Sequence, residues 1–341
     1  MRAAQLSAFN APLEIVDLAD PEPPEHGVVI RVKAAGVCRS DWHGWQGHDP
    51  DIKNLPHVLG HEFSGTIATI GGGVEGWEIG DRVTVPFVCG CGSCAQCDSG
   101  NTQVCPNQFQ PGFTAHGAFA ELVAIPNAAT NLVRLPGDVD FAPAAALGCR
   151  FATAYRALAH DDQANVKPGE RVAVFGCGGV GLSAVMIAEA RGAEVIAVDI
   201  RADALQAATE LGASHGFHPD EIGDLEADVT VDALGKTETC IAAIESLAPR
   251  GRHVQIGLMV GSDASPALPI GRVIGKELHI IGSHGMGAAA YPEMLDLVAD
   301  GTLQIEKLIA GSISLSDLPQ TIAAMGSFEG KPGVTLIDRF D

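Results

Sequence analysis

A glycine-rich turn between a strand and a helix constrains the fold of this chain more than any other feature. The apolar run 171–175 leads directly into the turn, and a helical stretch follows it through Arg191. The turn has the spacing G-x-G-x-x-G and consists of Gly176, Cys177, Gly178, Gly179, Val180 and Gly181. The first glycine permits a tight turn, the second lets the backbone approach a pyrophosphate, and the last allows the helix to pack closely on the strand. Because the first amides of the helix are free to bind phosphate, the turn predicts a dinucleotide site.

Further strand-like runs follow the turn and alternate with helical stretches. They occupy 194–199, 229–231, 253–256 and 278–281. Strands that alternate with helices in this way indicate an α/β unit with a parallel, doubly wound sheet of the Rossmann type.

The strand after the turn ends at Asp199, and this position favours one dinucleotide over another. A carboxylate there can bind both hydroxyls of the adenosine ribose and would repel a 2′-phosphate. The sequence therefore predicts NAD as the cofactor in preference to NADP. Arg201, just beyond this strand, is the nearby group that could instead accommodate such a phosphate.

The chain up to about Arg134 has a different pattern. Short β segments broken by Gly and Pro, at 27–32, 64–68 and 81–85, are typical of a barrel-like β domain. The pattern becomes helical between about 143 and 160. The tail from residue 291 is expected to hold one helix, at 292–300, and a last strand, at 333–337.

Four cysteines lie close together in a loop rich in glycine and polar residues. They are Cys91, Cys94, Cys97 and Cys105. Four thiolates at such short separations match a closed, tetrahedral Zn²⁺ site that holds a loop with little core of its own. We interpret Cys89, beside the cluster, as a spare thiol, and Cys177 and Cys240 as small core residues.

A second set of soft and basic side chains is dispersed along the chain. It comprises Cys38, the pair His61-Glu62, and Cys149. Spacing alone does not join these residues, because a single Cys or His is usually a core or surface residue.

Together these motifs resemble those of the zinc-containing medium-chain alcohol dehydrogenases over essentially the whole chain. The resemblance rests on the segment 36–43, on 60–62, on the four-cysteine loop and on the glycine turn with its downstream Asp199. It implies that the four-cysteine loop binds a structural zinc and that a catalytic zinc is bound as well, which makes two Zn²⁺ per subunit.

The same resemblance implies a division into two domains. A GroES-like β-barrel catalytic domain would comprise 1–148 and 286–341. A Rossmann NAD-binding domain would comprise 149–285.

The resemblance also joins the dispersed residues into a catalytic metal site. Cys38, His61 and Cys149 would hold the zinc and leave one coordination position open for the substrate oxygen. Glu62 would sit close behind and enter the metal's shell when water or substrate exchanges. Asp41 would orient His61.

Neighbouring residues take supporting roles by the same resemblance. Ser40 would be the first group of a proton relay that ends at His43 near the surface. Arg39 would reach the cofactor pyrophosphate. Trp45 and Phe87 would line the substrate pocket and narrow it toward short, unbranched alcohols, whereas Trp42 and Phe113 fit either the pocket or packing.

The expected activity is reversible hydride transfer between NAD and a primary or secondary alcohol, or its aldehyde or ketone. A polyol, threonine or formaldehyde dehydrogenase on the same scaffold is the alternative, although the polyol branch commonly has a glutamate where this chain has Cys149. A non-catalytic zinc protein would be expected to lack a ligand or relay group, and this sequence has them all.

Charge and hydropathy limit the partners. The chain has 42 acidic and 21 basic residues and a formal charge of −21, so nucleic acid and anionic membranes are poor partners. Such an acidic chain is typical either of adaptation to high salt or of an ordinary acidic enzyme.

Residues 1–20 lack the order of a signal peptide, so we expect a cytoplasmic protein. The resemblance implies that the protein is a homo-tetramer.

Overall fold

The computed structural model describes residues 1–327 and 330–340. Contacts between residues divide the chain into two compact units. Unit 1 comprises Met1–Ala152, Gly285–Gly330 and Val334–Asp341, and unit 2 comprises Thr153–His284 and Lys331–Gly333. The catalytic and NAD-binding roles predicted for 1–148 with 286–341 and for 149–285 stay a prediction. Among the described residues, no helix is long and apolar enough to cross a membrane.

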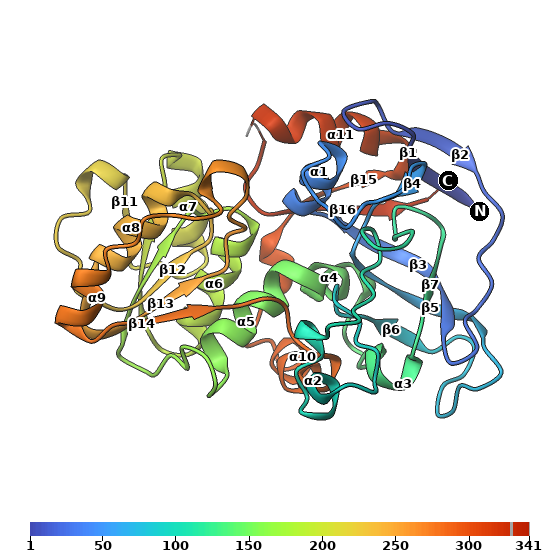
Figure 1. Cartoon of the computed structure of the whole chain (residues 1–341), viewed down its shortest axis with the longest axis horizontal. Coiled ribbons are helices and arrows are strands. Elements are labelled where there is room, and N and C mark those ends of the chain that lie inside the picture. The colour runs from blue at the N-terminus through green and yellow to red at the C-terminus, as the bar shows by residue number, and fades with distance from the viewer. Residues whose placement is uncertain (328–329, 341) are drawn as a thin grey trace. The chain divides into compact units, whose positions relative to one another are not determined.

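Unit 1 is built on two mainly antiparallel sheets, with one parallel pair between β15 and β16 (Figure 1). Its seven-stranded sheet has the order β15-β16-β3-β5-β6-β8, with β7 paired to β3, and a three-stranded sheet has the order β2-β1-β4. The strands are β1 (Arg2–Leu6), β2 (Glu14–Asp17), β3 (Val28–Val37), β4 (His57–Val58), β5 (Glu62–Ile70), β6 (Arg82–Thr84), β7 (Leu122–Ile125), β8 (Val133–Arg134), β15 (Ile309–Ser314) and β16 (Val334–Arg339).

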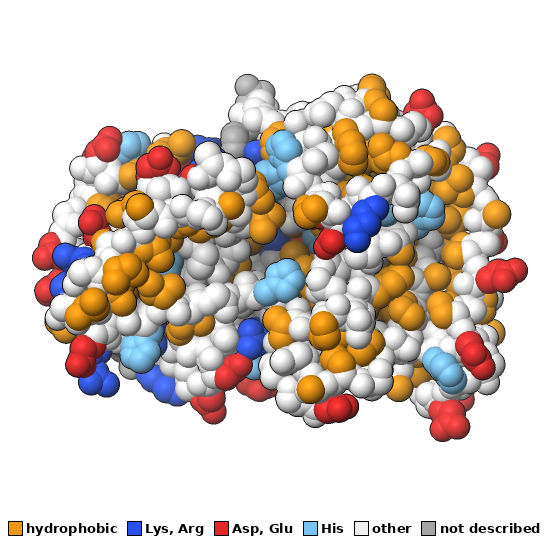
Figure 2. Space-filling model, in the orientation of Figure 1, with side chains coloured by type: hydrophobic (Ala, Val, Ile, Leu, Met, Phe, Trp, Pro, Cys, Tyr) orange, Lys and Arg blue, Asp and Glu red, His pale blue; other side chains and the backbone are white. Residues whose placement is uncertain are grey.

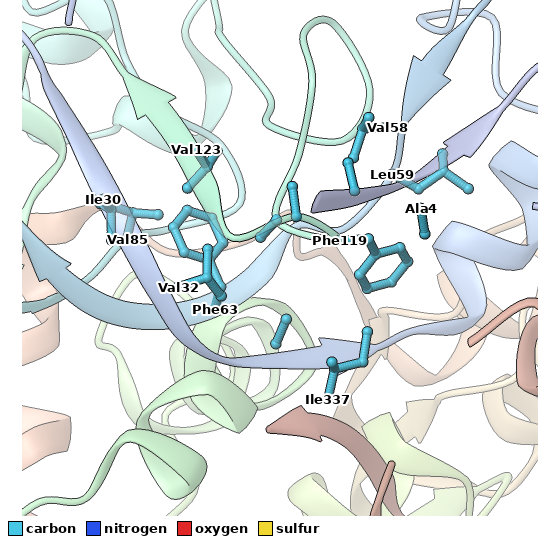
Figure 3. Packing of buried hydrophobic residues seen from close by; sticks show 14 of the residues in the cluster. Ala4, Ile30, Val32, Val58, Leu59, Phe63, Val85, Phe119, Val123 and Ile337 are labelled. Carbon is cyan, nitrogen blue, oxygen red and sulfur yellow. The ribbon is translucent and has the colours of Figure 1, made fainter. Parts of the chain in front are cut away.

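The core of unit 1 lies between these strands (Figure 3). Strand β3 contributes Ile30 and Val32, and Phe63, Phe119 and Ile337 reach the same cluster from segments distant in the sequence. All five are buried. Such large apolar side chains stabilise by about 1.5–3 kcal/mol each when fully buried, so this core can position loops that themselves contain little apolar surface.

Unit 2 contains a six-stranded, wholly parallel sheet. Its order is β11-β10-β9-β12-β13-β14, so the chain starts at β9, moves outward to β11, and returns to the other side of β9. The strands are β9 (Arg171–Phe175), β10 (Glu194–Val198), β11 (His215–Phe217), β12 (Ala227–Asp232), β13 (Leu247–Gln255) and β14 (His279–Gly282). The doubly wound parallel sheet predicted from the sequence is confirmed, and its reversal lies between β9 and β12, where such folds bind ligands.

Helices connect the strands of both units. In unit 1 they are α1 (Arg39–Trp45), α2 (Ala95–Asp98), α3 (Ala128–Asn131), α4 (Phe141–Ala146), α10 (Tyr291–Ala299) and α11 (Leu318–Ala324). In unit 2 they are α6 (Gly179–Ala190), α7 (Ala202–Glu210), α8 (Thr237–Glu245) and α9 (Ile270–Lys276), and α5 (Ala152–Ala159) begins at the boundary.

The predicted helical stretch 143–160 is not one regular helix. A π-helical segment, Leu147–Phe151, separates α4 from α5. Single π-turns inside helices are often found at functional sites, and this one contains Cys149.

The tail differs from its sequence prediction. Besides the expected helix and strand it contains β15 and α11, so the expectation of a single helix there was wrong. Strand β15 is rich in small residues and pairs in parallel with β16, while α11 buries Leu318 and Ile322 in the core of unit 1. Both elements depend on tertiary packing, which short local patterns do not reveal.

Candidate metal and nucleotide sites

The core of unit 1 brings four dispersed side chains together. Cys38 lies between β3 and α1, His61 directly precedes β5 and Glu62 begins it, and Cys149 lies in the π-helical segment. One ligand atom from each of the four lies within 4.8 Å of the others. Cys38, His61 and Glu62 are buried, and Cys149 is half-buried. The residues predicted as a catalytic metal site are therefore assembled in one place.

Asp41 fixes the geometry of this dispersed cluster. Its Oδ1 lies 2.9 Å from Nδ1 of His61 and accepts the Gly60 amide at 3.1 Å, while its Oδ2 accepts the Cys38 amide at 2.9 Å. Among the described residues, Nε2 of His61 is buried without a hydrogen-bond partner. With Nδ1 oriented by a carboxylate, the free Nε2 has the arrangement of a metal-ligating histidine.

The two cysteines of the dispersed cluster differ in pKa. A hydrogen bond with the Cys149 thiol holds the pKa of Cys38 well below its ordinary value, and the Arg150 charge lowers it further. The same hydrogen bond raises the pKa of Cys149 well above its ordinary value. The cluster therefore stabilises a thiolate at Cys38, which is the form that binds metal.

Glu62 is held by a residue that the sequence analysis did not single out. Arg150 donates to its Oε1 from Nε at 2.9 Å and from the backbone amide at 3.1 Å, and Nη2 of Arg150 bonds Oε2. Burial raises the pKa of Glu62, and Arg150 opposes that rise. The only signal in the sequence is a charged residue inside the otherwise apolar run 143–154.

Aromatic rings flank His61. The rings of Phe87 and Phe113 have centroids 6.0 Å and 4.9 Å from the imidazole. Trp45 lies in the core cluster of unit 1, and its indole N–H donates to the Ala11 carbonyl at 2.6 Å. The pocket roles of Trp45 and Phe87 stay a prediction, and Phe113 lies beside His61 as Phe87 does.

The predicted relay residues lie on α1, directly after Cys38. The Ser40 hydroxyl is 3.8 Å from Sγ of Cys38, and Nδ1 of His43 is 3.2 Å from Nδ1 of His48. Arg39 stacks over the ring of Trp42, with Cζ 4.0 Å from the centroid, and its Nη1 bonds the Met325 carbonyl. Ser40 is thus beside the cluster, and the roles of all three residues stay predictions.

The four-cysteine loop forms a second cluster. Sγ of Cys94 lies 3.5 Å from that of Cys97 and 3.7 Å from that of Cys105, and Cys91 completes the group. The loop is supported from outside, because the Asn131 side chain accepts the Gly90 amide at 2.8 Å and donates to the Gly90 carbonyl at 3.1 Å. Cys89 is fully buried and its pKa is raised to about 12, so it stays a thiol, as expected of a spare residue.

The glycine turn lies in unit 2 between β9 and α6. Gly176 has a φ of 89°, which favours glycine. A Cβ on Gly181 would lie 1.7 Å from the Gly176 carbonyl oxygen, whereas a Cβ on Gly178 would meet no atom within 4 Å. The last glycine is therefore required by close packing, and the space beside Gly178 is open to a ligand.

Asp199 ties the end of β10 to this turn. Its Oδ2 accepts the Cys177 amide at 2.7 Å, and its Oδ1 accepts the Arg201 amide at 2.8 Å. The Arg201 guanidinium turns to Asp203, where Nε donates to Oδ1 at 2.9 Å and Nη2 bonds Oδ2. Asp203 is a further residue that the sequence analysis did not single out.

Comparisons with known proteins point to one enzyme family. The chain matches the alcohol dehydrogenase GroES-like domain over residues 24–137 and the zinc-binding dehydrogenase domain over residues 179–300. It is 33% identical to an alcohol dehydrogenase of Geobacillus stearothermophilus over 89% of this chain and 90% of that one. A sorbitol dehydrogenase of Halalkalibacterium halodurans is 31% identical over 91% of each chain.

The fold agrees as well. The crystal structure of an NAD-dependent alcohol dehydrogenase superimposes on the whole of both chains with a TM-score of 0.88 and 31% identity. The predicted combination of a GroES-like β domain with a Rossmann-type sheet is confirmed. The chain therefore belongs to the family of zinc-binding, medium-chain alcohol dehydrogenases.

Proposed function

We propose that this protein is a zinc-dependent, NAD-linked alcohol dehydrogenase that interconverts a small primary or secondary alcohol with its aldehyde or ketone. The observation that carries the proposal is the dispersed cluster, in which two cysteines and a histidine with a free, buried Nε2 lie within 4.8 Å of one another beside Glu62. Thiolates and imidazole are the ligands that Zn²⁺ prefers, and three such ligands leave one position for substrate.

The donor set fits zinc in detail. Cys38, His61 and Cys149 would hold the ion, and Asp41 would orient His61 through its Nδ1. When bound, Zn²⁺ supplies a Lewis acid that polarises the C–O bond of the alcohol or carbonyl substrate. The protein's part is to keep the three ligands in place and the surroundings apolar, which Phe87 and Phe113 support.

The proton that an alcohol loses needs an acceptor chain. Ser40 is the hydroxyl beside the cluster, and it can accept one proton while donating another. We assign the surface end of the relay to His43, because imidazole exchanges protons near neutral pH. Its neighbour His48, 3.2 Å away, extends the chain of exchangeable groups.

The four-cysteine loop fits a second, structural zinc. The sulfurs of Cys91, Cys94, Cys97 and Cys105 provide four ligands and leave no position for substrate. The segment around them contains few buried apolar side chains, so a metal ion would supply the crosslink that the core does not.

NAD fits unit 2. It supplies the hydride acceptor, and the turn Gly176–Gly181 with the first turn of α6 offers the backbone amides that bind a pyrophosphate. Asp199, which follows β10 and bonds the Cys177 amide of the turn, would bind the adenosine ribose. Asp203 pairs with the Arg201 guanidinium, so a 2′-phosphate would have to compete with this exposed ion pair, and this favours NAD over NADP.

The rival activity is a polyol dehydrogenase, favoured by the similarity to a sorbitol dehydrogenase. Cys149 argues against it, because polyol dehydrogenases resembling this chain commonly have a glutamate as the third protein ligand. The test is a panel of primary alcohols, secondary alcohols, polyols and threonine, with NADH formation as the readout and zinc content measured in parallel. Two zinc ions per chain with turnover of simple alcohols is expected, and activity confined to polyols or threonine would overturn the assignment.

Self-association is a further part of the proposal. Strand β14 is an edge of the parallel sheet, and Ile280 on it is exposed, as are Ile270 and Ile274 of the adjacent α9. Figure 2 shows apolar side chains gathered on this end of unit 2. An exposed edge with apolar neighbours favours pairing with a second copy, in line with the predicted homo-tetramer, and Ile274→Lys is expected to lower the mass measured by light scattering.

The nine cysteines are all free of disulfides in the described residues. Free thiols of this number are typical of a reducing compartment. We therefore place the enzyme in the cytoplasm, with a small-molecule substrate as its partner.

A further inference from the structure

Arg150 is a buried cation in an unusual place. It directly follows Cys149, one of the proposed zinc ligands, and its side chain is 7% exposed, while that of its partner Glu62 is fully buried. A buried arginine normally needs its charge paired and its donors satisfied. Here its ion pair, among the described residues, is with Glu62, the carboxylate of the dispersed cluster.

Both carboxylate oxygens of Glu62 accept hydrogen bonds from Arg150. Oε1 accepts two hydrogen bonds, from Nε and from the backbone amide of Arg150, and Oε2 accepts a third from Nη2. Strand β3 leaves room for the pair, because Gly36 lies opposite Glu62 in the sheet and a Cβ there would be 2.4 Å from Oε2. The pair is thus built into the packing of two strands and the π-helical segment.

Glu62 nevertheless remains close enough to bind the metal. One of its carboxylate oxygens lies within 4.8 Å of the ligand atoms of Cys38, His61 and Cys149. A buried carboxylate without its own cation, beside those three ligand atoms, would take a bound Zn²⁺ as its counter-charge, because an unpaired buried charge is far more costly than a paired one.

Building on the function proposed above, we propose that Arg150 is a positioning residue that holds Glu62 beside the metal but outside its coordination shell, and so keeps the fourth position free for substrate. The charges agree with this role. Two thiolates balance one Zn²⁺ and Arg150 balances Glu62, so the metal needs no further carboxylate for charge balance. The buried carboxylate of Asp41 is held by His61 and two backbone amides.

A purely structural role makes a different prediction. The Arg150 amide also bonds Glu62, so the side chain could serve only to hold the π-helical segment and Cys149 in place. In that case removing the guanidinium would misplace a ligand whether or not Glu62 carries a charge. The two roles are separated by testing Arg150 with and without the Glu62 carboxylate.

The experiment compares wild type, Arg150→Gln, Glu62→Gln and the double variant, each with Co²⁺ in place of the dispersed-site zinc. The visible spectrum of Co²⁺ reports the ligands and geometry of the site, independently of turnover. In Arg150→Gln we expect a changed spectrum, with the metal retained, and a loss of kcat/KM of about 10–100-fold. In the Glu62→Gln background the same change should leave both the spectrum and kcat/KM within about twofold.

Controls keep the outcome unambiguous. Arg134→Gln removes an arginine from an exposed ion pair with Asp81 in the same unit, and it should leave the spectrum unchanged. If Arg150→Gln does not fold, Arg150→Met removes the charge while filling most of the space, and its cobalt spectrum should shift in the direction expected for Arg150→Gln. A wild-type spectrum in that variant would contradict the proposal.

Other outcomes overturn the inference or the function separately. An equal effect of Arg150→Gln in both backgrounds, or loss of metal from that variant, would leave Arg150 a structural residue only. A wild-type protein that binds no metal at the dispersed site would instead contradict the proposed function.

Discussion

The two cysteine clusters of unit 1 are built in opposite ways. The loop cluster takes all four sulfurs from one segment, 91–105, and three of them are partly exposed. The dispersed cluster takes its ligands from the end of β3, the start of β5 and the π-helical segment, and most of them are buried. The first holds together a segment that has almost no core, whereas the second is held by a core that exists without it. One site should therefore depend on metal for its structure, and the other for its chemistry.

The largest expected difference is in turnover. Cys38→Ser removes a thiolate ligand from the dispersed cluster and should lower kcat/KM by at least about 10³-fold, since polarisation by a metal contributes several kcal/mol. NAD binding and one zinc per chain should persist, measured by fluorescence titration and by metal analysis.

The matched control for this change is Cys240→Ala, which alters a buried cysteine outside both clusters. Its kcat/KM should stay within about twofold of wild type. Normal turnover in Cys38→Ser would contradict the assignment of the chemistry to the dispersed cluster.

The second largest expected difference is the response of the two clusters to metal removal. After treatment with a chelator, amide hydrogen exchange should accelerate by about 100-fold or more in 91–105, because metal binding there supplies folding free energy. The strands β3 and β5, next to the dispersed cluster, should keep their protection. Equal acceleration in both places would show that the core does not hold the dispersed cluster.

The orientation of His61 should affect metal affinity at the dispersed cluster but not at the four-cysteine loop. Asp41→Asn keeps the shape of the side chain but loses the charge and one acceptor, so metal affinity at the dispersed cluster should fall by about 10–100-fold. Competition with a chelating dye measures this affinity, and the loop zinc of the same molecule serves as the reference. A simultaneous loss at the loop would point to general destabilisation.

The smallest expected effect is a loss of stability at acid pH that involves neither metal cluster. Acid releases metal from both clusters, but unit 2 also loses stability of its own, since burial lowers the pKa of His253 below its ordinary value. Below about pH 6.5 the unfolded chain therefore binds a proton that the folded chain resists, so stability present at neutral pH is lost as the pH falls.

His253→Gln removes this titration while keeping a polar group near Thr230 and Gln255. The melting temperature of the variant should fall less between roughly pH 7 and pH 5 than that of wild type. Identical slopes would assign all acid sensitivity to groups other than His253.

The comparison also explains what could be predicted from the sequence. The glycine turn and the four-cysteine loop are local, so spacing alone predicted a nucleotide site and a metal site. Cys38, His61 and Cys149 are joined only by the fold, and resemblance supplied that connection. In the structure they meet because β3 and β5 are neighbouring strands of one sheet and the π-helical segment brings Cys149 to the same place.

Arg150 escaped prediction for a physical reason. Its partner Glu62 is 88 residues away, and the contact depends on a π-helical turn and on the space opposite Gly36. Tyr291 is a similar case, since its hydroxyl bonds the Gly148 carbonyl across 143 residues. No period or spacing in the sequence encodes such contacts, because they follow from how distant elements pack.

The spacing of the ligands along the chain has a consequence for how the protein is made. The segment 91–105 can close around an ion as soon as it leaves the ribosome, because only a short loop must form. The dispersed cluster needs Cys149, so it cannot be complete until β3, β5 and the π-helical segment have met. We therefore expect the two ions to be acquired in a fixed order during synthesis, the loop ion first, with the reactive centre assembled last on a folded chain.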